Sequence, residues 1–242
     1  MNRKTAIAVR MLVAVPLVAW LAGCGQNAAE AEADLEPQAG DDSIAESTVQ
    51  GVDFEVDTAA WDGAPVVAEN LTPIRVSITN HSDQPLRIRY ANFALLGAYD
   101  RYAALPPLVL QREDDVVVLA AGGPVVDRPE FDYTGFFVAP YYAPAYPRLT
   151  PYEGSLMVDE DYYRRYLAVW SALPGLPDEE IARKALPEGV LGTDASVSGF
   201  LYFEHVADGE EKVNFMAQAE NAETHDYFGT ALIPLENEDH LL

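Results

Sequence analysis

The chain has 242 residues, of which 49% are hydrophobic and 10% aromatic, and its formal net charge is −24 at pH 7. This length and this apolar fraction suffice for a sizeable core, which excludes a chain that is disordered throughout. A surface with this negative charge repels nucleic acid and anionic lipid headgroups, so we exclude a nucleic-acid partner.

The N-terminus is a basic start followed by an uncharged apolar run. Arg3, Lys4 and Arg10 precede a stretch, Met11 to Ala22, that is almost wholly apolar. A helix needs about 20 such residues to span a bilayer, so this run is too short for a transmembrane helix. A basic start with a short apolar run is typical of a secretory signal peptide.

The only cysteine of the chain follows this run directly. The tetrad LAGC, residues 21–24, resembles the bacterial lipobox. The resemblance implies a lipoprotein signal peptide over residues 1–23, cleavage before Cys24, and a diacylglycerol and an N-acyl chain on Cys24. Two or three acyl chains hold a protein durably on a membrane, whereas one chain gives marginal binding. The alternative is an ordinary signal peptide with a cysteine there by chance.

Lipidation of Cys24 would determine which thiol chemistry the protein retains and where in the cell it is found. It would leave no thiol for a disulfide, a nucleophile or a metal site, and we predict no cofactor besides the covalent lipid. It would also anchor the protein in a bacterial cell envelope. In many bacteria with two membranes, Asp after the lipidated cysteine favours the inner membrane. Because Gly25 stands there instead, we expect the outer membrane where the cell has one.

Residues 24–48 have the composition of a disordered acidic tether. They are mostly Ala, Glu, Asp, Gln and Ser, and no Lys or Arg occurs from Met11 to Ile74. Such a segment cannot build a hydrophobic core, and its like charges extend it. Folded structure is predicted from about Val49, because the next apolar residues alternate with acidic ones: Val52, Phe54 and Val56.

The clearest strand signal is PIRVSITNHSDQPLRIRY, residues 73–90. Apolar residues alternate with polar ones on both sides of NHSDQP, a run of residues that favour turns. We therefore predict a β-hairpin with one buried face. Alternation predicts further strands at 102–105, 115–120, 198–204, 212–220 and 227–234.

A segment of different composition, about residues 111–195, interrupts these strands. Gly135 to Gly154 is dense in Pro and Tyr, which predicts a loop with restricted backbone. Residues 159–173, DEDYYRRYLAVWSAL, begin with acids and place apolar residues at helical spacing, which predicts a helix. A second short helix is predicted between Pro177 and Pro187.

Short strands separated by turn residues indicate an antiparallel β-sandwich. The stretches TNHSDQPLRI, NFALL, GFLYFEHV and TALIPLE resemble the immunoglobulin-like domains of unknown function that are common in bacterial surface lipoproteins. The resemblance covers about residues 51–105 and 198–235. It implies a mainly β, immunoglobulin-like antiparallel β-sandwich over residues 49–237 with a partly helical insertion, and it implies no catalytic residues.

The Tyr- and Pro-rich loop is the candidate binding surface. Aromatic rings on a stiff backbone can bind glycans or partner proteins at low entropic cost. The candidate residues are Tyr141, Tyr142, Tyr146, Arg148 and Tyr152. The alternative is a lid whose rings pack over one end of the sandwich, beside Tyr163 and Trp170.

Three functions remain open. We favour a non-enzymatic, lipid-anchored envelope protein that binds an envelope protein or a glycan through its insertion. An envelope-polymer hydrolase or modifying enzyme with its site in the insertion is the first alternative, although the sequence contains no nucleophile-elbow, zinc-protease or phosphate-loop motif. A periplasmic cation-binding protein is the second, with a weak candidate site at Glu204, His205 and Asp208, because carboxylates favour hard cations such as Ca²⁺.

Overall fold

The computed structural model describes residues 43–236 except 114–115, 121–122, 132, 174, 208 and 211. Cys24, the predicted signal peptide and the predicted tether up to residue 42 lie outside the described residues. Within the described part of the chain, no helix is long and apolar enough to cross a membrane.

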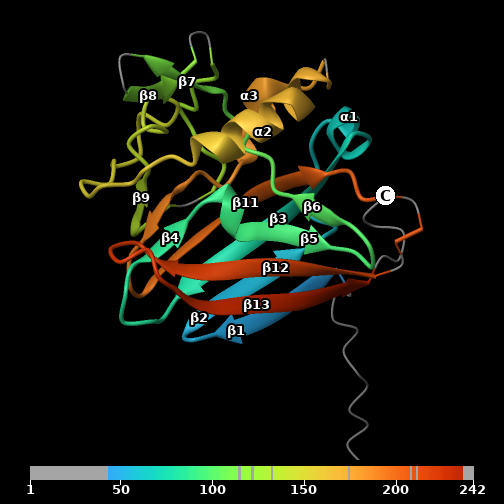
Figure 1. Ribbon diagram of the computed structural model, residues 1–242, viewed down its shortest axis with the longest axis horizontal. Helices are drawn as coiled ribbons and strands as arrows, with labels where there is room; N and C mark the ends of the chain where they lie inside the picture. Colours follow the sequence, from blue (N-terminus) through green and yellow to red (C-terminus); the bar gives the residue numbers. More distant parts are fainter. Residues whose placement is uncertain are drawn as a thin grey trace, which may run out of the picture. The chain divides into compact units, whose positions relative to one another are not determined.

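Two antiparallel sheets pack face to face (Figure 1). Sheet A runs in the order β1 (Ile44–Val49), β2 (Val52–Asp57), β3 (Leu71–Asn80) and β11 (Ala195–Glu204). Sheet B runs in the order β6 (Arg101–Ala103), β5 (Phe93–Leu96), β12 (Lys212–Asn221), β4 (Leu86–Ile88), β10 (Gly189–Leu191) and β9 (Phe136–Val138), and β13 (Tyr227–Glu236) also pairs with β12. The predicted fold class, a mainly β antiparallel sandwich, is confirmed.

The core lies between the two sheets, as the alternation of apolar residues requires. On β3, Ile74, Val76 and Ile78 are fully buried, while the residues between them are partly exposed. They belong to one apolar cluster with Phe93 and Phe215 of sheet B, whose ring centroids lie 6.1 Å apart. Each inner face therefore comes from every second residue of a strand.

Helices and a small hairpin complete the fold. They are α1 (Pro65–Ala68), the 3₁₀ turn η1 (Tyr90–Asn92), α2 (Glu160–Ser171), α3 (Asp178–Lys184) and the hairpin of β7 (Leu110–Glu113) with β8 (Val116–Leu119). Both predicted helices of the insertion are present as α2 and α3. Asp159 caps α2, since its carboxylate accepts a hydrogen bond of 3.1 Å from the Tyr162 N–H. In Figure 1, α2, α3 and the β7–β8 hairpin lie at the same end of the sandwich.

The predicted hairpin at residues 73–90 is wrong. β3 pairs with β2 and β11 in sheet A, whereas β4 pairs with β10 and β12 in sheet B. The turn exists, but it crosses from one sheet to the other. Buried Asn80 holds it: its Oδ1 accepts from the Ser82 N–H at 3.1 Å, and its Nδ2 donates to the Gln84 carbonyl at 2.9 Å and the Gly192 carbonyl at 3.1 Å.

Two boundaries also differ from the prediction. β1 begins at Ile44, inside the segment assigned to the tether, because its backbone pairs with β2 although most of its side chains are small or polar. The insertion of residues 111–195 is not separate from the sandwich, because its strands β9 and β10 extend sheet B beside β4. Strands this short give too few residues for alternation to reveal them. The remaining predicted strands correspond to β6, β8, β11, β12 and β13, with ends shifted by a few residues.

Candidate functional site

The tyrosines of the Tyr- and Pro-rich loop pack inside the protein. Tyr142 and Tyr146 are fully buried and stack with ring centroids 6.2 Å apart, and Tyr141 is 8% exposed. The Tyr163 hydroxyl donates a hydrogen bond of 2.9 Å to the Tyr142 hydroxyl. Buried rings cannot contact a partner, so these three residues do not form the predicted binding surface. Their placement matches the alternative of a lid packed on the sandwich.

A buried carboxylate ties this lid to sheet B. Glu188, directly before β10, accepts a hydrogen bond of 2.8 Å from the Tyr90 N–H and one of 2.6 Å from the Tyr141 hydroxyl. Burial raises the pKa of Glu188, although the hydrogen bonds from Tyr141 and Tyr90 oppose the shift. Glu188 is 4% exposed, and its two hydrogen bonds hold the loop in place.

The other two members of the predicted set lie nearer the surface. Arg148 is exposed and forms an ion pair with Asp127 at 3.0 Å between Nε and Oδ1. The hydrogen bond and charge of Arg148 lower the pKa of Asp127. Tyr152 is half-buried, and its N–H donates to the Val138 carbonyl at 2.8 Å. The structure therefore separates the predicted set into buried rings and a surface ion pair.

The predicted cation site has no ligand cluster in the described residues. Glu204 accepts a hydrogen bond of 3.2 Å from the Ala103 N–H, and His205 is exposed. Asp208 lies outside the described residues. No group of three or more His, Cys, Asp or Glu that could hold a metal ion occurs in the part of the chain that the structure describes.

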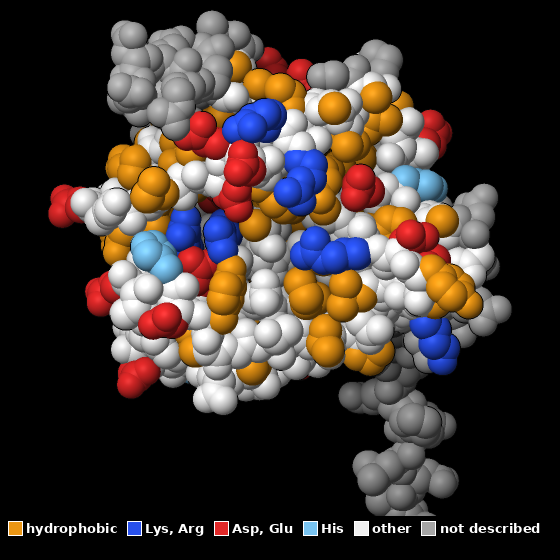
Figure 2. Space-filling view, in the orientation of Figure 1, with side chains coloured by type: hydrophobic (Ala, Val, Ile, Leu, Met, Phe, Trp, Pro, Cys, Tyr) orange, Lys and Arg blue, Asp and Glu red, His pale blue; other side chains and the backbone are white. Residues whose placement is uncertain are grey.

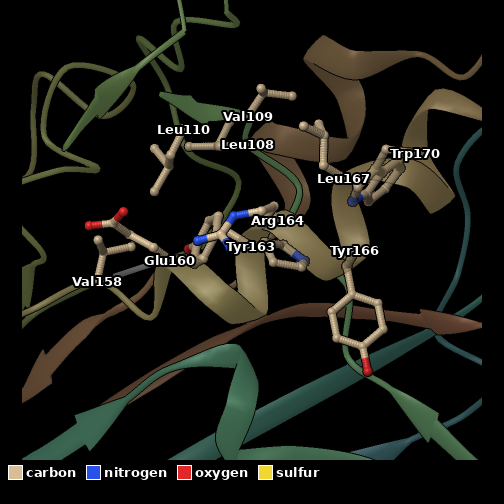
Figure 3. A pocket seen from close by; sticks show the side chains of 11 residues that line it. Leu108, Val109, Leu110, Val158, Glu160, Tyr163, Arg164, Tyr166, Leu167 and Trp170 are labelled. Carbon is tan, nitrogen blue, oxygen red and sulfur yellow. The ribbon is translucent and has the colours of Figure 1, made fainter. Parts of the chain in front are cut away.

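An apolar hollow lies between α2 and the segment Pro106–Leu110, which leads into β7 (Figure 3). We call it the insertion groove. Its volume is about 200 Å³. One wall is Leu108, Val109 and Leu110, and the other is formed on α2 by Tyr163, Leu167 and Trp170.

The two faces of α2 explain why this groove exists. Tyr162 anchors the helix, since its hydroxyl donates a 2.6 Å hydrogen bond to the Ala104 carbonyl. Tyr163, Leu167 and Trp170 follow at helical spacing on another face. In Figure 3, Leu167 and Trp170 lie toward the Leu108–Leu110 wall, whereas Tyr166 points away from it. The indole N–H of Trp170 is buried without a hydrogen-bond partner in the described part of the chain.

The lips of the insertion groove carry exposed apolar side chains. Val109 is 43% exposed and Leu167 is 39% exposed, on opposite walls. Single exposed apolar residues are common on protein surfaces, but apolar residues that face each other across a hollow are typical of a binding site. The groove was not predicted from the sequence, because its two walls come from segments that are far apart along the chain.

A second hollow adjoins the groove, because Val158, Glu160 and Arg164 line both. We call it the polar hollow; its volume is about 550 Å³. Its remaining lining is Arg87, Arg89, Met157, Asp159, Asp161 and His225. In the view of Figure 2, basic side chains, acidic side chains and a histidine gather beside the turn that joins β12 to β13.

Buried Glu220 fixes two of these arginines. Its Oε1 lies 3.0 Å from Nη1 of Arg87, and its Oε2 lies 2.8 Å from Nε of Arg89. Asn92 donates a further 3.0 Å hydrogen bond to Oε2, and Arg87 Nη2 donates to the Met157 carbonyl at 2.6 Å. Glu220 is 1% exposed, so the two guanidinium groups are held by a carboxylate that water does not reach.

His225 presents a hydrogen-bond donor. Nη1 of Arg87 lies 3.0 Å from Nδ1 of His225. A guanidinium group can only donate, so Nδ1 accepts and the neutral ring carries its proton on Nε2. Ser198, a serine of sheet A, donates its hydroxyl hydrogen to Ser77 at 2.9 Å, which is a structural contact between strands.

The comparisons with known proteins are sparse. No family model matches the chain, and no curated protein matches it. Among solved structures, the putative lipoprotein YcdA of Bacillus subtilis is similar, with a TM-score of 0.35 and 9% sequence identity over 81% of this chain. The chain spans 40% of the length of that structure. A likeness of this size identifies no shared function.

Proposed function

We propose that this chain is a lipid-anchored, non-enzymatic protein of the bacterial cell envelope that binds a ligand in its insertion groove. The tetrad LAGC ending at Cys24 supports the anchor, and Gly25 supports an outer-membrane destination in a cell with two membranes. The observation that carries the binding role is the groove itself, with exposed Val109 and Leu167 on its opposite lips.

The shape and chemistry of the groove fit binding better than catalysis. Ligand sites are concave and mostly apolar, with a few polar groups that orient the ligand. Here the polar groups, Glu160 and Arg164, are shared with the polar hollow. The histidine beside them, His225, has its Nδ1 in contact with Arg87 Nη1 at 3.0 Å, so this nitrogen is occupied inside the protein, which weighs against the hydrolase alternative.

Site-specific photo-cross-linking in intact cells tests this role. A photoreactive residue at position 167 is expected to form an adduct with an envelope component. The same residue at position 232 is the matched control, because Leu232 is 56% exposed on β13 and does not line the groove. The adduct at 167 should disappear when Val109→Glu places a charge on the opposite lip. Equal adducts at both positions, or no adduct at 167, would contradict the proposal.

A further inference from the structure

We propose that the ligand of the insertion groove is a zwitterionic amphiphile with one apolar chain. The chain would lie in the groove, and a headgroup with one negative and one positive charge would lie in the polar hollow. The inference rests on the proposed function, because it names the ligand class of the same groove. This ligand class is supported by the volume, the lining residues and the charges of the two hollows.

The groove is suited to part of a ligand and not to a whole one. Its volume of about 200 Å³ is below the ~300–1,000 Å³ that is usual for small-molecule sites. Its two walls are apolar or aromatic, with Leu108 and Leu110 opposite Leu167 and Trp170. A narrow hollow of this kind accepts an alkyl chain, and it offers little to a sugar ring or a charged group.

The headgroup would lie next to the chain because the two hollows adjoin each other. Val158, Glu160 and Arg164 line both of them. Figure 3 shows Glu160 on the side of the groove away from Trp170, and the Arg164 side chain between the two with its guanidinium group toward Glu160. The part of the groove that adjoins the polar hollow therefore carries the charged side chains, whereas the part at Leu167 and Trp170 is apolar, which is the polarity of an amphiphile.

The charges of the polar hollow fit a zwitterion. Among the residues that line it, basic and acidic side chains are balanced: Arg87, Arg89 and Arg164 against Asp159, Glu160 and Asp161. A headgroup with a single charge of either sign meets repulsion as well as attraction there. A headgroup with both charges can place each one beside its opposite.

The arginines beside β12 in the polar hollow are held in fixed positions. Glu220 holds Arg89 in position at 2.8 Å, so this guanidinium group, whose side chain is 20% exposed, loses little freedom when it meets an anion. His225 adds an Nε2–H donor, as its contact with Arg87 requires. Fixed donors of this kind suit a phosphate group, whose oxygens accept several hydrogen bonds.

The exposed ion pair at the outer side of the polar hollow can open when a ligand binds. Arg164 and Asp161 form an ion pair of 2.9 Å between side chains that are 72% and 79% exposed. Exposed pairs of this type contribute little to stability. The ion pair can therefore break at little cost in free energy, and Arg164 and Asp161 can then each bind one charge of a headgroup.

Calorimetric titration with four amphiphiles that share an octyl chain tests the inference. The probes are octylphosphocholine (zwitterionic), octyl sulfate (anionic), octyltrimethylammonium (cationic) and octyl glucoside (uncharged), all below their micelle concentrations. The protein is the full chain with Cys24→Ser, which carries no lipid of its own. Octylphosphocholine is expected to bind at least about tenfold more tightly than each of the other probes.

Two variants locate this binding. Leu167→Glu should abolish it, while the matched control Leu232→Glu, at an exposed apolar residue of β13, should bind like the parent chain. Arg164→Gln should reduce the preference for octylphosphocholine over octyl glucoside to within about twofold. Thermal unfolding of each variant shows whether it is folded, and Val109→Glu replaces Leu167→Glu if the latter is not.

Three results would overturn the inference: equal affinity for all four probes, tighter binding of a singly charged probe, or unchanged binding by the Leu167→Glu chain. If octylphosphocholine does not bind while a photoreactive residue at position 167 still labels an envelope component in cells, the zwitterion is wrong and the proposed function stands. If neither occurs, both are wrong.

Discussion

The hydroxyl of Tyr141 donates a hydrogen bond of 2.6 Å to Oε2 of Glu188, inside the protein. This contact joins a loop that the sequence predicts as either a binding surface or a packed lid to a carboxyl group that precedes β10 in sheet B. Its other oxygen is bound by the Tyr90 N–H at 2.8 Å. The lid and the sheet thus share one buried polar group, whose ionisation is linked to folding.

Glu188→Gln is expected to change how stability depends on pH. Burial raises the pKa of Glu188 in the folded protein above its ordinary value of 4.5. Between these two pKa values the folded chain holds a proton that the unfolded chain has lost, so rising pH favours unfolding, by at most about 1.4 kcal/mol per pH unit. The parent chain should therefore lose stability relative to Glu188→Gln as the pH rises through this window. Urea unfolding at a series of pH values measures the difference.

The matched control for this prediction is Glu153→Gln. Glu153 is exposed, so the difference between this variant and the parent should not follow the same pH course. A constant difference between Glu188→Gln and the parent across the whole series would contradict the linkage.

Tyr142→Ala is expected to cost about 3–5 kcal/mol of unfolding free energy, because it leaves a cavity where a large ring was buried. Tyr142 is fully buried between Tyr146, on which it stacks, and the hydroxyl of Tyr163. Tyr99→Ala is the control: that ring is 96% exposed and its loss should cost no more than about 0.5 kcal/mol. Similar losses in the two variants, measured by chemical unfolding, would show that the lid is not part of the cooperative fold.

Glu220→Ala is expected to destabilise the protein by about 3–5 kcal/mol, since it leaves Arg87 and Arg89 beside each other without their buried carboxylate. Asp161→Ala removes an acid from the exposed pair with Arg164 and should cost about 0–1 kcal/mol. The comparison of the two midpoints in urea checks this prediction. An equal effect would mean that the Glu220 network contributes no more than a surface ion pair.

Cys24→Ser is expected to move the protein out of the membrane fraction and to leave residues 1–23 attached, because the proposed anchor is the thiol of Cys24. Cell fractionation and the mass of the purified chain report the two effects. Gln26→Ser changes a neighbouring residue outside the LAGC tetrad and should fractionate like the parent. Membrane association and processing that survive Cys24→Ser would remove the lipid anchor from the proposed function.

The strands β3 and β4 show how far the sequence predicts this fold. Alternation in residues 73–90 gives the buried face of β3 correctly, since Ile74 and Val76 are buried, but on β4 Arg87 is buried as well as Leu86. It does not give the partners of a strand, because a turn can join two strands of one sheet or cross between two sheets with the same local residues. The contact that decides here, Asn80 with the Gly192 carbonyl, is far away in sequence.

The candidate site was predictable only in part. The density of tyrosine in residues 141–152 signals an unusual segment, but the same rings suit a buried lid or an exposed surface. The insertion groove depends on the meeting of Pro106–Leu110 with α2, which no local pattern encodes. One signal was present: α2 carries large side chains on two faces, Tyr162 on one and Tyr163 with Leu167 on the other, which is more than a single packing surface requires.

The pairing of β10 with β4 and of β9 with β10 has a mechanical consequence. A pull on any molecule captured at the insertion passes directly into the backbone hydrogen bonds of sheet B, because no flexible stalk of chain intervenes between lid and sheet. Tension on the insertion would therefore be borne by the whole sandwich.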